Sequence, residues 1–324
     1  MTPPDNSPFP QNPEQWERKT LEKLVFATLN EQRARRRWGI FFKILTFLYL
    51  LIVLLAMMGW GKGPETKSLS RHTAVINLQG IIDAQGEASA EKLNAALAAA
   101  FSDKNTAGVI LRINSPGGSP VQSGSVFDEM RRQKKLHPDI PLYVVIEDLC
   151  ASGGYYIAAG ADEIYVNRAS LVGSIGVLMD SFGFTDAMAK LGIERRLMTA
   201  GENKGFLDPF SPLNENQKAH VQTLLDELHQ QFIEAVRQGR GNRLKETPEL
   251  FSGLIWSGEK SVQMGLADGF GSVESVARDK IKAENLVDFS VRENFAERLA
   301  KRLGANAAAG FGQAFRETMQ SGVR

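Results

Sequence analysis

The sequence predicts an α/β protein built on a parallel sheet with crossover helices. Two kinds of observation support this prediction. Apolar, β-branched strand patterns alternate along the chain with helical patterns. Glycine pairs at 117–118 and 153–154 follow two of the predicted strands. Because the functional crevice of such a sheet lies at the carboxyl ends of its strands, we expect both glycine turns to face each other there.

The first two strands are each followed by a helix. Residues 72–78 are predicted as a strand, and residues 88–101 as an alanine-rich amphipathic helix. Residues 107–113 (AGVILRI) form a second buried strand, followed by the sequence Asn-Ser-Pro-Gly-Gly and a helix at residues 121–136. This half of the pattern therefore contains one complete crossover.

The third strand leads to a small-residue turn. Residues 141–146 (PLYVVI) are β-branched and aromatic, and a helix is expected directly after Ser152. A short strand at 163–166 and helices at 184–191 and 214–240 complete the series. The last helix carries apolar residues at a spacing of three and four, which predicts a packing element, and they are Val221, Leu224, Leu225, Leu228, Phe232, Ile233 and Val236.

Composition limits the classes of protein. The chain has 324 residues, of which the first 70 differ from the rest, so about 250 residues remain for one large core. The formal charge of +1 comes from 38 basic and 37 acidic residues, and gives no indication of a nucleic-acid partner. The single cysteine, Cys150, excludes an intramolecular disulfide, and we expect it to be a buried packing residue.

An apolar segment near the amino end predicts a membrane anchor. Residues 44–60 are 17 residues without charge, and with residues 40–42 beyond Lys43 the segment reaches the roughly 20 residues that a bilayer core requires. Trp38 and Trp60 bracket it, and the preceding arginines predict a cytoplasmic amino end and an exported remainder. A cleaved signal peptide and a buried core helix are the alternatives, but the long preceding arm disfavours the signal peptide.

The anchor divides the chain into five predicted segments. These are a cytoplasmic arm at 1–39, the transmembrane anchor at 40–60, a polar linker at 61–71, one large domain at 72–290 and a basic, helical tail at 291–324.

Ser152 is the candidate nucleophile. It lies in the sequence LCASGGYYIA, where a strand turns into a helix, and the following glycines allow a sharp turn. The helix amino end would direct free N–H groups at a charge forming beside Ser152. The alternative is an ordinary N-cap serine with glycines that serve packing.

A serine nucleophile needs a base, and the four histidines offer no convincing one. His220 and His229 lie among polar residues of the long helix, where we expect them to be solvated. No histidine or cysteine pair has metal-ligand spacing, so no metal is predicted. A lysine can act instead when burial keeps it neutral, and Lys204, in a loop of glycine, proline and aromatic residues, is the candidate. Taken alone, a loop lysine is typically solvated.

Four motifs in this order resemble the signal peptide peptidase A (SppA) family. They are 114–118 (NSPGG), 149–158 (LCASGGYYIA), 170–176 (SLVGSIG) and the loop at 200–210 that contains Lys204. The resemblance covers about residues 72–285 and makes the domain at 72–290 a serine protease domain. It implies the Clp protease/crotonase-like fold, which by itself does not define a reaction.

The resemblance also implies catalytic roles. Ser152 would be the nucleophile, Lys204 the general base and acid, and Ser174 the hydroxyl that holds the lysine amine. The oxyanion hole would use backbone N–H groups of the Gly117–Gly118 turn and of Gly153. Gly118 is the expected donor of that turn, with Gly117 as the alternative, and such donors are worth several kcal/mol to a transition state.

The same resemblance implies a setting. The substrates would be cleaved signal peptides within the membrane, and the enzyme a single-pass protein of the bacterial inner membrane with its protease domain outside the cytoplasm. The half-length members of the family form homo-oligomeric rings in which serine and lysine come from neighbouring subunits. No cofactor is expected.

Two alternatives belong to other classes. A membrane-anchored scaffold could keep the fold without catalysis, but the presence of both Ser152 and Lys204 argues against it. A crotonase-like acyl-thioester enzyme could use the same oxyanion geometry. Export disfavours this reading, because coenzyme A is a cytosolic cofactor.

Overall fold

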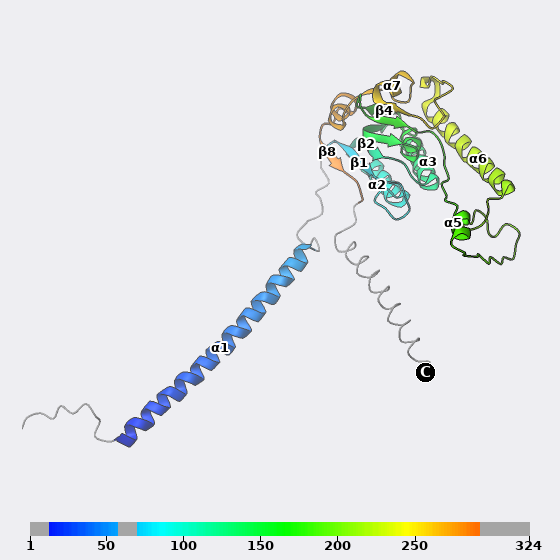
Figure 1. Cartoon of the computed structure of the whole chain (residues 1–324). Helices are drawn as coiled ribbons and strands as arrows, with labels where there is room; N and C mark the ends of the chain where they lie inside the picture. Colours follow the sequence, from blue (N-terminus) through cyan, green and yellow to red (C-terminus); the bar gives the residue numbers. More distant parts are fainter. Residues whose placement is uncertain (1–12, 58–69, 292–324) are drawn as a thin grey trace, which may run out of the picture. The chain divides into compact units, whose positions relative to one another are not determined.

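The computed structural model describes residues 13–57 and 70–291, and the chain divides into two units. One unit contains the helix α1 (Pro13–Met57), and the other contains every later element of the structure (Figure 1). Within residues 13–57 and 70–291, no helix is both long and apolar enough to cross a membrane. Parts of four predicted segments lie outside the described residues. They are the cytoplasmic arm up to residue 12, the transmembrane anchor from residue 58, the polar linker up to residue 69 and the tail from residue 292.

A single sheet forms the centre of the second unit. Its strands in the described part of the chain are β1 (His72–Gln79), β2 (Thr106–Ser115), β3 (Leu142–Ala151), β4 (Glu163–Val166), β5 (Leu171–Gly173), β6 (Ile255–Ser257), β7 (Gly269–Phe270) and β8 (Leu286–Asp288). The order is β6-β5-β3-β2-β1-β8, while β4 pairs with β3 and with β7. Every pair is parallel except β5 with β6. The predicted parallel sheet is therefore confirmed.

Strand β3 changes neighbours along its length. Val144, in its first half, lies opposite Ile164 of β4, whereas Ala151, at its end, lies opposite Gly173 of β5. On its other edge, β2 ends with Ser115 opposite Cys150. The turns that follow β2 and β3 thus leave the sheet side by side, as the glycine pairs predict.

Helices cover both faces of the sheet (Figure 1). Within the described residues, the helices of this unit are α2 (Ala90–Ser102), α3 (Pro120–Leu136), α4 (Gly153–Ala158), α5 (Thr185–Lys190), α6 (Glu215–Arg240), η1 (Gly241–Arg243), α7 (Gly258–Gln263), α8 (Val273–Val276) and η2 (Ala277–Ile281). Of these, α5 lies away from the sheet and does not cover it (Figure 1). Because side chains alternate across a strand, Leu111 and Val144 join the core formed with α2, α3, α4 and α6. Ile110 and Val145 face the other way, toward α8 and η2.

The helices and strands predicted within residues 72–240 are confirmed, with ends that shift by a few residues. The main difference is β3, which continues to Ala151 and brings Ser152 directly to the end of the strand. Cys150 is buried there, as expected. Strands β5 to β8 were not predicted, because segments of two or three residues are too short to show alternation.

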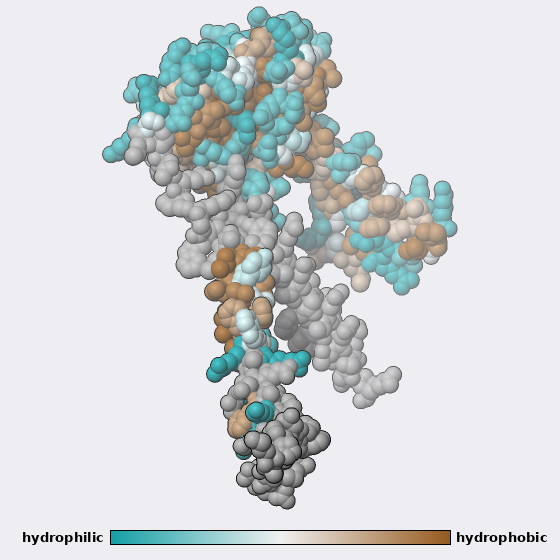
Figure 2. Space-filling view, turned by 90° about the vertical axis from the view of Figure 1, so that its left-hand side faces the viewer, coloured by the Kyte–Doolittle hydropathy of each residue, from teal (hydrophilic) through white to brown (hydrophobic). Residues whose placement is uncertain are grey.

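Residues 177–213, which we call the arm, contain α5 and leave the body of the second unit (Figure 1). The arm is held together locally, since the Phe184 N–H donates to the Pro209 carbonyl at 2.7 Å and the Phe184 and Phe210 rings stack at 5.4 Å. Many of its apolar side chains are exposed (Figure 2): Leu178, Met179, Phe182, Phe184, Leu191, Ile193, Leu197, Met198, Phe206, Phe210 and Leu213. Exposed apolar surface of this extent is typical of an interaction site.

Candidate active site

Ser152 lies in a strained turn between β3 and α4. Its φ of 50° and ψ of −123° fall in a region that residues with a side chain rarely adopt. Its N–H donates to the Gly173 carbonyl at 2.9 Å, and its carbonyl accepts from the Tyr156 N–H at 2.9 Å. The Ser152 side chain makes no capping hydrogen bond to α4, although the residue holds the N-cap position. The turn therefore presents a hydroxyl that the helix does not use.

The Gly117–Gly118 turn packs directly against Ser152. A Cβ on Gly117 would lie 2.7 Å from the Gly153 nitrogen and 2.8 Å from the Ser152 Cβ. A Cβ on Gly118 would overlap the Ile82 carbonyl, and both glycines have positive φ, 99° and 151°. This close approach of two backbones requires glycine at both positions.

Two backbone N–H groups of these turns are left without an acceptor. The Gly117 N–H is already used, because it donates to the Ser115 Oγ at 3.1 Å. Within the described residues, the N–H groups of Gly118 and Gly153 have no acceptor, the latter because Gly153 is the first residue of α4. A Cβ on Gly153 would lie 3.3 Å from the Gly118 nitrogen, so the two donors are neighbours. The geometry favours Gly118 over Gly117 as the donor toward an anion.

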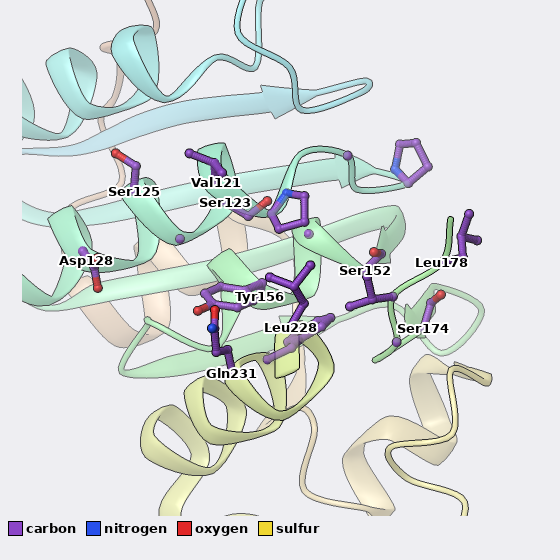
Figure 3. Close-up of a pocket in the computed structure, with 18 of the residues that line it drawn as sticks. Val121, Ser123, Ser125, Asp128, Ser152, Tyr156, Ser174, Leu178, Leu228 and Gln231 are labelled. Carbon is purple, nitrogen blue, oxygen red and sulfur yellow. The ribbon is translucent and has the colours of Figure 1, made fainter. Parts of the chain in front are cut away.

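Ser152 lines a cavity of about 1140 Å³. Figure 3 shows Ser152, Ser174 and Leu178 at one side of it, and Ser125 and Asp128 at the other. The cavity is bounded by α3, α4 and α6, which contribute Val121, Tyr156, Leu228 and Phe232 among others. It is large enough for side chains of an extended peptide.

Ser174, the predicted partner of the lysine amine, lies on the same cavity. It directly follows β5, with a positive φ of 51°, and its N–H donates to the Leu254 carbonyl at 2.8 Å. The next residue, Ile175, has its carbonyl 3.1 Å from the His229 Nε2 of α6. The expectation that His229 is solvated is therefore wrong, since it is half-buried in this contact, whereas His220 is exposed.

Lys204 lies apart from this cavity. It belongs to a turn of the arm in which its N–H donates to the Gly201 carbonyl at 3.1 Å, and it is exposed. It is not among the described residues that line the cavity beside Ser152. The structure thus brings Ser152, Ser174 and the glycine turns together, and does not bring the Lys204 of the same chain to them.

The sequence did not indicate two features of the site. Ser115 belongs to the NSPGG motif, but its role as acceptor for Gly117 depends on the side-chain direction at the end of β2. Tyr156 of α4 and Leu228 of α6 form cavity walls although both follow ordinary core patterns. Among the described residues, no group of three or more histidine, cysteine or acidic side chains is arranged to hold a metal ion.

Comparison with known proteins gives the chain a family. Residues 134–287 match the model of peptidase family S49. A Brucella abortus protein named Na(+)/H(+) antiporter NhaA is 40% identical over 225 residues, which are 67% of this chain and 30% of that protein. The putative signal peptide peptidase SppA of Enterococcus faecium is 34% identical over 191 residues, 59% of this chain and 55% of that protein. Protease 4 of Haemophilus influenzae is 32% identical over 228 residues, which are 69% of this chain and 36% of that protein.

The chain spans less than two thirds of the length of these relatives. Most of the Brucella protein lies outside the match, so we do not transfer the activity in its name to this chain. The fold and the site define an α/β protein with a serine beside two backbone N–H groups that have no acceptor among the described residues. The S49 match includes Ser152, Ser174 and Lys204, and the chain belongs to the SppA/S49 peptidase family.

Proposed function

We propose that this protein is a serine endopeptidase that acts through Ser152 and Lys204. The observation that carries the proposal is the turn at Ser152, which is strained, makes no capping bond and lies beside two N–H groups without acceptors. Backbone strain of this kind is typical of catalytic sites. Family membership supports peptide hydrolysis as the reaction. We also propose that the fold, in which β3 is shared between two sets of neighbours, is of the Clp protease/crotonase-like type.

In the proposed mechanism, the Ser152 Oγ attacks the carbonyl carbon of the scissile peptide bond, and the neutral Lys204 amine accepts the hydroxyl proton. The N–H groups of Gly118 and Gly153 donate to the oxyanion, each contributing about 3 kcal/mol to transition-state stabilisation. The lysine passes the proton to the leaving amine, which breaks the C–N bond and leaves an acyl-enzyme. Water, deprotonated by the same lysine, then releases the acid and restores Ser152, while Ser174 holds the lysine amine in place.

The lysine is proposed to come from a second copy of the chain. Lys204 lies on the arm, outside the cavity that Ser152 lines. The arm also carries the exposed apolar side chains that an interface between copies would bury. A homo-oligomeric ring, in which each arm reaches the cavity of a neighbour, satisfies both observations, and an isolated monomer would then be inactive.

We propose remnant signal peptides as substrates and the bacterial inner membrane as the location, with the amino end in the cytoplasm. This part rests on the family resemblance and on the apolar segment at 40–60 with its preceding arginines. A tethered enzyme meets membrane-dissolved peptides at a high effective concentration. Release of the full chain from membranes by alkaline carbonate would contradict the anchor.

The proposed reaction is tested with the purified full chain and an apolar fluorogenic peptide. We expect Ser152→Ala to lower the cleavage rate by about three orders of magnitude or more, because the nucleophile is lost. A fluorophosphonate probe should label the wild type at Ser152 and not this variant, and EDTA should leave the rate unchanged. Ser102→Ala, at the exposed end of α2, is the control and should behave as the wild type. A Ser152→Ala protein as active as the wild type would refute the proposal.

A further inference from the structure

The cavity beside Ser152 changes character along its length. Part of its wall is apolar: Leu228 of α6 lies between the Ser152 end and the Asp128 end, and Val121 of α3 lies further along, beside Ser125 (Figure 3). Tyr156 forms part of the same wall. Its ring packs edge-on against Phe127, with centroids 5.5 Å apart, and at a tilt against Phe232, with centroids 5.0 Å apart. A substrate side chain that extends from Ser152 toward Asp128 would therefore contact an apolar surface first.

The far end of the cavity is polar and carries one uncompensated negative charge. The described charged residues that line it are Asp128, Glu129 and Arg132. Arg132 donates through Nε and one terminal nitrogen to both carboxylate oxygens of Glu129, each at 2.7 Å, so that pair is neutral overall. Asp128 makes no hydrogen bond or ion pair with any residue that the structure describes, and it is exposed to the cavity.

Two polar groups lie at the same end as Asp128. Figure 3 shows the Tyr156 hydroxyl and the Gln231 amide on the Asp128 side of the cavity. The negative charge of Asp128 acts on Tyr156, since burial and this charge together raise the pKa of the phenol. A carboxylate, a phenol oxygen and an amide oxygen are together suited to accept hydrogen bonds from a cation.

The distance along α3 fits a long side chain. Ser123 lies next to the Gly153 backbone, because a Cβ on Gly153 would overlap the Ser123 Oγ. Asp128 lies five residues further along the helix, which corresponds to about 7.5 Å at 1.5 Å per residue. This separation is comparable to the reach of an extended lysine or arginine side chain, whose apolar stem could follow the cavity wall.

We propose that Asp128 is a specificity-determining residue that favours peptides with lysine or arginine immediately before the scissile bond. The inference rests on the proposed peptidase function and names a substrate class for the same site. The aliphatic stem packs between Val121 and Leu228, and the cationic end reaches the Asp128 carboxylate beside the Tyr156 hydroxyl. Signal peptides combine a basic region with an apolar region, so both halves of this cavity match their composition.

The test uses two fluorogenic peptides that differ only in lysine or norleucine before the scissile bond. The measured quantity is the ratio of kcat/KM for the lysine peptide to that for the norleucine peptide, with the full chain as enzyme. We expect Asp128→Asn to lower this ratio two- to fivefold, about the effect of one solvent-exposed charge pair. Asp128→Lys should lower it further, and high salt should bring the wild-type ratio toward that of Asp128→Asn.

Asp139→Asn removes an exposed carboxylate that does not line the cavity, and should leave the ratio unchanged. Cleavage of the norleucine peptide by all variants separates this inference from the proposed function. If that peptide is cleaved normally while the ratio is the same in wild type, Asp128→Asn and Asp128→Lys, the role of Asp128 is refuted. If the wild type cleaves neither peptide, the proposed function fails and this inference fails with it.

Discussion

At the residue scale, Ser115 determines which amide of the glycine turn is free. Its Oγ donates to the Gly80 carbonyl at 2.6 Å and accepts from the Gly117 N–H at 3.1 Å. Ser115 is fully buried, so water cannot replace these bonds without rearrangement. The side chain therefore anchors the turn and occupies the Gly117 N–H, whereas the N–H of Gly118, which also lines the cavity, has no acceptor among the described residues.

We expect Ser115→Ala to lower kcat about tenfold with little change in KM, because the turn loses its anchor while the cavity walls stay in place. The unfolding free energy should fall by about 1–3 kcal/mol, since the buried Gly117 N–H loses its acceptor and the part-buried Gly80 carbonyl loses its donor. Steady-state kinetics and chemical denaturation measure the two effects.

The control for this change is Ser261→Ala. Ser261 is also fully buried, and its Oγ donates to the Gly258 carbonyl at 2.7 Å, away from the cavity. It should lower stability and leave kcat unchanged. A kcat for Ser115→Ala that equals that of Ser261→Ala would mean that Ser115 has a structural role only.

Site features that depend on local backbone geometry could be predicted from the sequence, whereas features that depend on packing between distant segments could not. The turn at Ser152 and the glycine pairs could be found because LCASGGYYIA and NSPGG determine local backbone geometry. The contact of Ser115 with Gly80 and the position of Asp128 depend on how separate strands and helices pack, which these motifs do not specify. Whether Lys204 meets Ser152 also depends on an arrangement beyond one chain.

At the scale of elements, α6 is anchored at its carboxyl end by a buried ion pair. Arg240, whose side chain is fully buried, donates to both Asp268 oxygens at 2.8 and 2.9 Å and to the Gly265 carbonyl at 2.9 Å. Asp268 also accepts from the Ile164 N–H of β4 at 2.7 Å. The pair thus connects α6 to the sheet. The preceding turns of α6 carry the cavity wall residues Phe232 and Leu228.

We expect Asp268→Asn to lower the unfolding free energy at neutral pH by about 3 kcal/mol or more, because it leaves the Arg240 charge buried without a counter-ion. Burial alone would raise the pKa of Asp268, but the hydrogen bonds and charge of Arg240 outweigh it and the net pKa is lowered. The stabilisation is therefore complete above about pH 4, the unfolded-state value, and is lost as the pH falls through the lower folded-state value.

Chemical denaturation at several acid pH values measures the difference in unfolding free energy between wild type and Asp268→Asn. This difference should shrink as the pH falls. Glu246→Gln removes the exposed partner of Arg237 on the same helix and should change stability by less than about 1 kcal/mol. A difference between wild type and Asp268→Asn that stays constant down to strongly acid pH would contradict the assignment.

The predictability of elements follows their length. Long periodic segments such as α6 and strands such as β2 could be recognised from sequence, because each contains several repeats of its pattern. Strands β5 and β6 could not, since three residues each carry little pattern, although β5 provides the carbonyl that fixes Ser152. The arm was predicted only as a helix and a loop, and its exposed apolar surface became visible only in the folded chain.

At the scale of the whole molecule, the structure of one chain brings together only part of the catalytic groups that we propose. Ser152, Ser174 and the two free N–H groups lie at one cavity, whereas Lys204 lies on the exposed arm. A second copy whose arm enters this cavity would complete the set and would bury the apolar side chains of the arm. The central claim is therefore that serine and lysine act across a subunit boundary.

The most direct test is peptide cleavage by full chains that carry Ser152→Ala or Lys204→Ala, separately and co-expressed with different affinity tags so that mixed assemblies can be isolated. We predict that each variant alone is inactive. Mixed assemblies should recover about a quarter of the wild-type rate, because half of the chains keep the serine and half of their neighbours keep the lysine. A co-purified mixed assembly that stays inactive, or a Lys204→Ala protein that retains full activity, would contradict the account.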